Sequence, residues 1–120
     1  MLAEAAAAPE REVCGLLFGT EGVEVTTIQP CANVAAKPAD TFEIDPASLI
    51  AAHKAQRSGG PTLIGCYHSH PNGAGAPSLR DSESADGGQK LWLIVAGNRI
   101  SAWLVAGQGR FDEVAIVSPD

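Results

Sequence analysis

The chain is short of basic residues, of long apolar runs and of cysteines, and each shortage narrows the class of protein. Eight Lys and Arg stand against 14 Asp and Glu in 120 residues, so the formal charge is −6, and no basic cluster is present. Such a chain is poorly suited to bind a nucleic-acid backbone. No apolar run approaches the length of a membrane span, and residues 1–8 lack the positive start and long apolar core of a signal peptide. We therefore expect no nucleic acid and no membrane as partner.

The cysteines are three in number, at Cys14, Cys31 and Cys66, widely spaced and without a CxxC pair. An odd count of isolated cysteines is typical of buried free thiols in a reducing compartment. We therefore expect a cytoplasmic protein. Hydrophobic residues make up 45% and charged residues 18%, an ordinary globular balance, and the length suits one domain over residues 1–120.

Hydrophobic periodicity and turn residues predict a mixed order of helices and strands. Asp45-Pro46 is a good helix start, with the aspartate as N-cap, and Leu49, Ile50 and His53 fall on one face of that helix. We expect a hairpin turn at 21–22 and loops over 29–40 and 71–77. Helices are expected at 2–8, 45–57 and 78–85, and strands at 13–19, 23–28, 41–44, 61–70, 91–96, 100–105 and 111–117. This order favours an α/β (α+β) fold with a mixed sheet.

Two histidines, His68 and His70, stand at the end of the expected strand over 61–70. Residues i and i+2 of a strand point to the same face, about 6.6 Å apart along the axis. Two imidazoles at that spacing can converge on one zinc ion, with Zn–N bonds of about 2.0 Å. Two ordinary histidines at a strand end explain the pattern equally well. Cys66 shares the face, but three such positions spread over about 13 Å, so we expect Cys66 to be a core thiol.

Two more elements accompany the histidines. Ser78 and Asp81 form an S-x-x-D sequence, which resembles a capping box at a helix start. A capped helix start would also hold both side chains on one side, where Asp81 could be a third ligand. Glu12 lies immediately before an apolar strand, and a solvated charge is the simpler interpretation of it, as it is of Glu10.

Together these residues spell Glu12, then His68-x-His70, a gap of seven residues, and Ser78-x-x-Asp81. This pattern resembles the JAMM motif of the JAMM/MPN (Mov34/PAD-1-like) zinc metalloproteases, E…H-[ST]-H-x7-S-x-x-D. The flanking segments 12–17, 42–46 and 68–71 are similar to those of small bacterial members. The resemblance covers nearly the whole chain and implies the MPN/JAMM fold, a cytidine deaminase-like mixed curved sheet flanked by helices.

The resemblance also implies a role for each motif residue. His68, His70 and Asp81 bind one Zn²⁺ per chain, and a catalytic water completes the site. Glu12 acts as general base and then as acid, and Ser78 donates a hydrogen bond to the oxyanion. These residue types suit the chemistry, because zinc lowers the pKa of water toward about 7 and a nearby carboxylate can carry the proton.

The implied reaction is hydrolysis of a peptide or isopeptide bond after the C-terminal Gly-Gly of a ubiquitin-like or sulfur-carrier protein. We expect the glycine-rich loop over 73–75 to line a narrow groove for such a tail. Two alternatives stay open: a non-catalytic MPN-type interaction module, and a RadC-like domain. The first has usually lost ligands that this chain keeps, and the acidic charge counts against the second.

Overall fold

The computed structural model describes residues 1–20, 24–39, 41–78, 81, 91–107 and 110–116. The elements within these residues, in chain order, are α1 (Leu2–Ala7), β1 (Cys14–Thr20), β2 (Glu24–Cys31), α2 (Pro46–Arg57), β3 (Thr62–Ser69), β4 (Leu91–Ala96), β5 (Arg99–Gly107) and β6 (Arg110–Val114). The expected turn at 21–22 lies outside the described residues, as does nearly all of the expected helix over 78–85.

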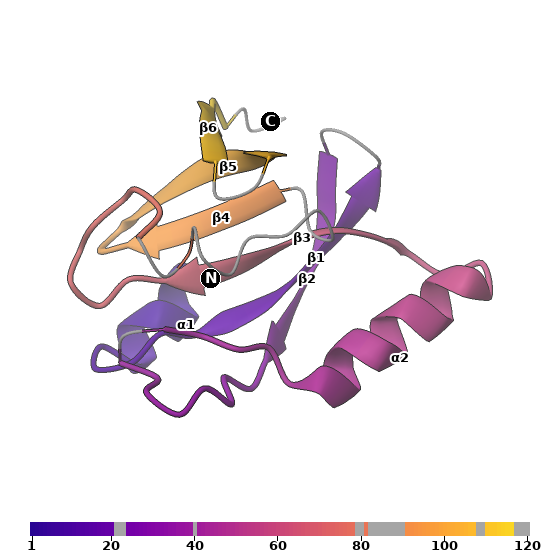
Figure 1. The fold of residues 1–120 in the computed structure, drawn as a ribbon, viewed down its shortest axis with the longest axis horizontal. Coiled ribbons are helices and arrows are strands. Elements are labelled where there is room, and N and C mark those ends of the chain that lie inside the picture. The colour runs from indigo at the N-terminus through magenta and orange to yellow at the C-terminus, as the bar shows by residue number, and fades with distance from the viewer. Residues whose placement is uncertain (21–23, 40, 79–80, 82–90, 108–109, 117–120) are drawn as a thin grey trace.

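All six strands form one sheet, in the order β2-β1-β3-β4-β5-β6. The neighbours β3 and β4 run parallel, and every other pair is antiparallel. Figure 1 shows the arrows of β3 and β4 pointing the same way, with the chain after β3 looping outward from that end. The predicted α+β fold with a mixed sheet is confirmed.

The sheet is packed on both faces, so its inner strands are buried. Residues 14–18 of β1 are all buried, which explains why this strand is an unbroken apolar run. One face carries a core cluster that includes Ala52 of α2 together with Cys14, Cys66 and Trp92. The opposite face is built around Leu17, Tyr67, Leu93 and Ala102, with Met1 packed against them. Tyr67 donates a hydrogen bond to Glu4 of α1 over 2.5 Å, so α1 and α2 lie on opposite faces.

The helix start at Asp45-Pro46 forms as predicted. The carboxylate of Asp45 accepts a hydrogen bond from the backbone N–H of Ala47 over 3.1 Å, and Pro46 occupies the first helical turn. Of the residues that share one face of α2 by their spacing, Leu49 packs against the core, whereas Ile50 is 56% exposed and His53 is exposed. Ala52 is the buried residue of this helix, so α2 packs on the sheet through Ala52 and Leu49.

Two predictions for the segment between β2 and α2 were wrong. The predicted loop over 29–40 begins too early, because β2 continues to Cys31, which pairs with Cys14. Because β2 is an edge strand, it tolerates Pro30, whose missing N–H donor would be more costly in a central strand. The predicted strand over 41–44 is absent from the described residues there, where an isolated bridge joins Asn33 and Ile44. Neither described helix is long and apolar enough to cross a membrane.

We predict that Gly65→Ala lowers the free energy of unfolding by about 1–3 kcal/mol, the usual cost of overpacking. Gly65 pairs with Leu91 where β3 meets β4, and a Cβ there would overlap the backbone carbonyl of Leu91. Backbone cannot move aside as a side chain can. Chemical denaturation gives the unfolding free energy, with Gly75→Ala as the control because a Cβ at Gly75 meets only open space. Equal stability of the two variants would contradict this packing.

Candidate active site

The predicted metal-ligand histidines lie where β3 ends. His68 is fully buried among aromatic rings, since Phe42 stacks on it with ring centroids 4.3 Å apart and Trp92 meets it edge-on at 5.4 Å. His70 is the first residue beyond β3, and its backbone N–H donates to the carbonyl of Val95 over 2.8 Å. The Nε2 atoms of the two histidines are 3.0 Å apart. The strand spacing therefore brings both imidazoles to one point.

Asp81 joins the two histidines, and Ser78 holds it there. Its Oδ2 atom is 3.0 Å from Nε2 of His70 and 3.2 Å from Nε2 of His68. The same oxygen accepts from the backbone N–H of Ser78 over 2.8 Å, and the N–H of Asp81 donates to Ser78 Oγ over 3.1 Å. This reciprocal pair is a capping box. The capping and ligand interpretations of Ser78-x-x-Asp81 thus describe one arrangement.

The donor geometry fits a metal ion. The two Nε2 atoms and Oδ2 of Asp81 form a triangle with sides of 3.0, 3.0 and 3.2 Å. Ligand atoms around a tetrahedral zinc, with bonds of about 2.0–2.1 Å, stand about 3.3 Å apart. Hydrogen bonds alone satisfy this triangle poorly, because each Nε2 carries at most one proton and three contacts must be filled. The residues present therefore suit a zinc-type ion held by two imidazoles and one carboxylate.

The hydrogen bonding of His70 leaves its Nε2 free to act as a ligand. Its Nδ1 atom donates to the backbone carbonyl of Ala74 over 2.7 Å. A proton fixed on Nδ1 places the lone pair on Nε2, as is usual for histidines that bind metals. Within the described residues, Nδ1 of His68 has no hydrogen-bond partner.

Burial and hydrogen bonds shift the pKa values of the cluster. Burial alone would raise the pKa of Asp81, but hydrogen bonds from His68 and His70 outweigh it and hold that pKa well below its usual range. Burial lowers the pKa of His68. Burial also lowers the pKa of His70, yet the hydrogen bonds to Asp81 and to Ala74 outweigh it and raise that pKa overall. At neutral pH Asp81 is therefore an anion, which suits a cation beside it.

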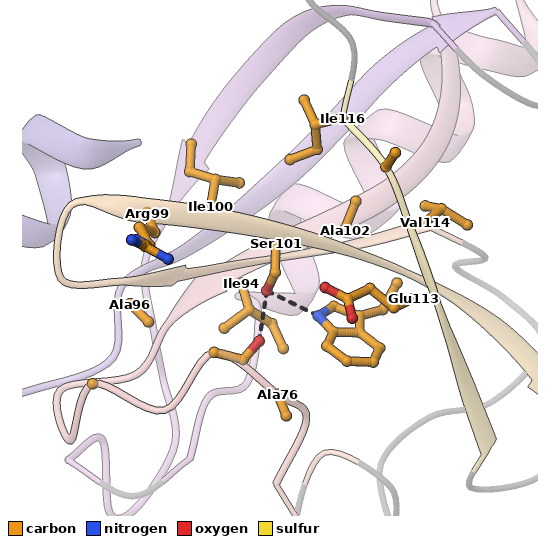
Figure 2. Close-up of a pocket in the computed structure, with 14 residues that line it drawn as sticks. Ala76, Ile94, Ala96, Arg99, Ile100, Ser101, Ala102, Glu113, Val114 and Ile116 are labelled. Carbon is orange, nitrogen blue, oxygen red and sulfur yellow. Dashed lines mark hydrogen bonds between the residues drawn. The ribbon is translucent and has the colours of Figure 1, made fainter.

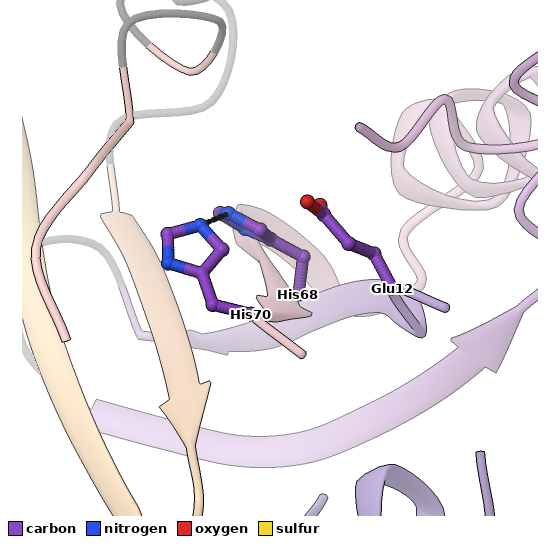
Figure 3. A group of neighbouring side chains, drawn as sticks. All are labelled: Glu12, His68 and His70. Carbon is purple, nitrogen blue, oxygen red and sulfur yellow. Dashed lines mark hydrogen bonds between the residues drawn. The ribbon is translucent and has the colours of Figure 1, made fainter. Parts of the chain in front are cut away.

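Glu12 reaches the cluster through the pairing of β1 with β3. Cys14 lies opposite His68 in this antiparallel pair, so two residues further along Glu12 comes opposite His70 on the same face. Its carboxylate is 4% exposed, and its ligand oxygen lies within 4.8 Å of the ligand atoms of both histidines. Figure 3 shows the Glu12 side chain beside the rings of His68 and His70. A solvated charge is therefore the wrong interpretation of Glu12, whereas Glu10 is exposed.

The other residues weighed in the sequence lie away from the cluster. Cys66 is fully buried in the core behind it, as predicted, and His53 is exposed on α2. Sequence reasoning missed the stacking of Phe42 on His68, and it missed Ser69. The hydroxyl of Ser69 accepts from the backbone N–H of Val13 over 2.9 Å and so ties the residue after Glu12 to β3. The position of Ser69 between the two histidines is the one hint of this role in the sequence.

A groove of about 720 Å³ lies over β4, β5 and β6, and none of the five motif residues is among those that line it. The loop after His70 lines one side of it with Gly73, Gly75 and Ala76. Figure 2 shows how the loop is attached: Trp103 Nε1 donates to Ser101 Oγ over 2.9 Å, and Ser101 donates to the carbonyl of Gly75 over 2.6 Å. The same loop thus contacts His70 and borders the groove, as the glycine-rich sequence led us to expect.

The sequence matches a protein family and several curated proteins. Residues 1–106 match the family of prokaryotic homologues of the JAB domain. The chain is 40% identical over 91 residues to a desampylase of Haloferax volcanii, covering 75% of this chain and 66% of that protein. It is 39% identical over 75 residues to a probable TtuB-protein conjugate cleaving protease of Thermus thermophilus, covering 62% and 49%. The chain therefore spans less than two thirds of either curated relative.

A solved structure resembles the whole fold. The solution structure of a protein from Desulfitobacterium hafniense superposes with a TM-score of 0.80 at 30% identity, covering 98% of this chain and 84% of that one. The fold, the spacing of the motif and the match over residues 1–106 agree, and the resemblance noted in the sequence is confirmed. The chain belongs to the prokaryotic JAB/MPN family.

Proposed function

We propose that the protein is a zinc-dependent metallopeptidase that hydrolyses a peptide or isopeptide bond after the C-terminal Gly-Gly of a ubiquitin-like or sulfur-carrier protein. The observation that carries this proposal is the triangle of two imidazole nitrogens and one carboxylate oxygen, with sides of 3.0–3.2 Å, together with the buried carboxylate of Glu12 within 4.8 Å of a ligand nitrogen of each histidine. A structural zinc site needs four protein ligands, whereas three ligands beside a carboxylate suit a catalytic one.

In this proposal His68, His70 and Asp81 hold the zinc. Asp81 is the third ligand because its Oδ2 contacts both Nε2 atoms at the spacing expected around a tetrahedral ion. Zinc held there supplies Lewis acidity, which lowers the pKa of water and polarises a carbonyl. The anionic carboxylate of Asp81 favours a cation beside the two imidazoles, and that cation would in turn attract the oxygen of a carbonyl.

Glu12 and Ser78 carry the remaining steps. Glu12 takes the proton from the attacking water and passes it to the leaving amine, a role that suits a buried carboxylate close to the histidines. Ser78 Oγ accepts from the N–H of Asp81, and this leaves its own O–H proton free to donate to the oxyanion of the substrate. The capping box therefore fixes the ligand and the oxyanion donor together.

The substrate follows from the groove and from the relatives. One relative is named a desampylase and another a probable TtuB-protein conjugate cleaving protease, so both names describe the removal or cleavage of a protein modifier. A Gly-Gly tail lacks side chains and can lie close to the loop over 71–77, whose Gly73, Gly75 and Ala76 border the groove. The three cysteines are free thiols, which suits the reducing cytoplasm.

We predict that the purified protein binds one zinc ion per chain and that His70→Ala or Asp81→Ala weakens zinc affinity by more than about 10–100-fold, the usual effect of losing an outer-shell partner alone. Competition with a chromophoric chelator measures the affinity. His53→Ala is the control, because His53 is an exposed histidine on α2. Zinc affinity that is equal in all four proteins would exclude this ligand set.

We predict that Glu12→Gln keeps zinc and lowers cleavage by about 10²–10⁴-fold, the usual contribution of a general acid-base. The substrate is a conjugate in which the C-terminal Gly-Gly of a ubiquitin-like protein is joined to a lysine of a second protein. Gel analysis follows the release of the ubiquitin-like protein. Glu10→Gln is the matched control, since Glu10 is an exposed carboxylate two residues away.

Chelator treatment should abolish cleavage, and added zinc should restore it. Cleavage that persists in chelator, or full activity of Glu12→Gln, would refute the mechanism. Zinc-loaded wild-type protein that leaves every Gly-Gly conjugate intact would favour the non-catalytic interaction module.

A further inference from the structure

Asn33 uses its whole side-chain amide in the segment that joins β2 to α2. Its Nδ2 atom donates to the backbone carbonyls of Glu12 and Thr41, over 2.9 and 3.1 Å. Its Oδ1 atom accepts from the backbone N–H groups of Ala35 and Glu43, over 3.0 Å each. An amide offers two donors and two acceptor positions, so every one of them is filled.

These four bonds link Glu12 to the residues on either side of Phe42. Both Glu12 and Phe42 lie outside the strands of the sheet. Glu12 precedes β1, and residues 33–39 support it twice, through Asn33 and through the carbonyl of Pro38, which accepts from the N–H of Glu12 over 2.7 Å. Phe42 lies between Thr41 and Glu43, both bonded to Asn33, and its ring stacks on His68 at 4.3 Å. One side chain thus connects the backbone of Glu12 to the ring that covers a histidine of the site.

We propose that Asn33 is a positioning residue, which holds Glu12 and Phe42 in register with His68. Among the described residues the four hydrogen bonds of the Asn33 side chain go to Glu12, Ala35, Thr41 and Glu43 and none goes to a histidine, so Asn33 acts through Glu12 and through the neighbours of Phe42. The need for it is physical: Glu12 lies two residues before the first residue of β1 and bonds through its backbone to Pro38 and Asn33, whereas the neighbouring Val13 bonds to Ser69 of β3. A carboxylate misplaced by about 1 Å can lose a large part of its catalytic effect. The catalytic part of this proposal rests on the proposed function.

Asn33→Asp is the sharpest variant, because it changes one side of the amide alone. An aspartate keeps the acceptor for Ala35 and Glu43 but turns an oxygen toward the carbonyls of Glu12 and Thr41, where Asn33 donates. We expect kcat to fall about 10–100-fold, as for the loss of other outer-shell partners, with KM and zinc content unchanged. Gln56→Ala is the matched control, since Gln56 also bonds a backbone group, the N–H of Leu63 over 3.0 Å, at the far end of β3.

Two further measurements separate positioning from simple stability. In the Glu12→Gln background, Asn33→Asp should cost little additional activity, because a residue that acts through Glu12 loses its effect once the carboxylate is gone. The ring protons of His68, followed by NMR in the zinc-loaded protein, should lose the ring-current shift from Phe42 in Asn33→Asp and keep it in Gln56→Ala. Asn33→Ala serves as a second variant if Asn33→Asp does not fold.

The proposal is overturned if Asn33→Asp matches Gln56→Ala in kcat and in the His68 shift, or if its effect adds in full to that of Glu12→Gln. Failure of the proposed function has a different signature. Wild-type protein would then cleave no conjugate, while the NMR shift would still report whether Asn33 holds Phe42 against His68.

Discussion

The site depends on the antiparallel pairing of β1 with β3. Because Cys14 lies opposite His68, the chain that enters β1 passes over the end of β3, and Glu12 arrives beside His70 from a position 58 residues away in the sequence. A slip of one residue in this register would turn Glu12 to the other face of the sheet. The hydroxyl of Ser69 adds a bond to the N–H of Val13 at this junction, so the register is held by a side chain as well as by the ladder.

The cluster is costly to bury, and the surrounding structure offsets that cost through specific partners. A buried carboxylate is unfavourable without compensation. The Oδ2 atom of Asp81 lies 3.0–3.2 Å from both imidazoles and accepts a hydrogen bond from the backbone N–H of Ser78, and these neighbours keep Asp81 ionised at 3% exposure. Aromatic rings exclude water from the back of His68. The interior is thus arranged around a group of polar atoms that a cation would complete, and this arrangement supports the assignment of His68, His70 and Asp81 to zinc.

Two segments outside the sheet border the site: one supports Glu12, and the other borders the groove. Residues 33–39 hold the backbone of Glu12 through Asn33 and Pro38, and residues 41–44 place the ring of Phe42 against His68. On another side, the loop over 71–77 bonds to His70 and borders the groove, and Ser101 anchors it to β5. This loop therefore contacts a histidine of the proposed ligand set and also lines the groove.

The sequence by itself determined the local features. The apolar run of β1, the capped start of α2 and the spacing of His68, His70, Ser78 and Asp81 follow from periodicity, capping and turn chemistry, which act between near neighbours. Tertiary structure decided which distant groups meet. Glu12 and Glu10 look alike in the sequence, and strand pairing buries the first and exposes the second. The extension of β2, the exposure of Ile50 and the links made by Asn33 and Phe42 likewise depend on contacts between segments far apart in the chain, which no local pattern records.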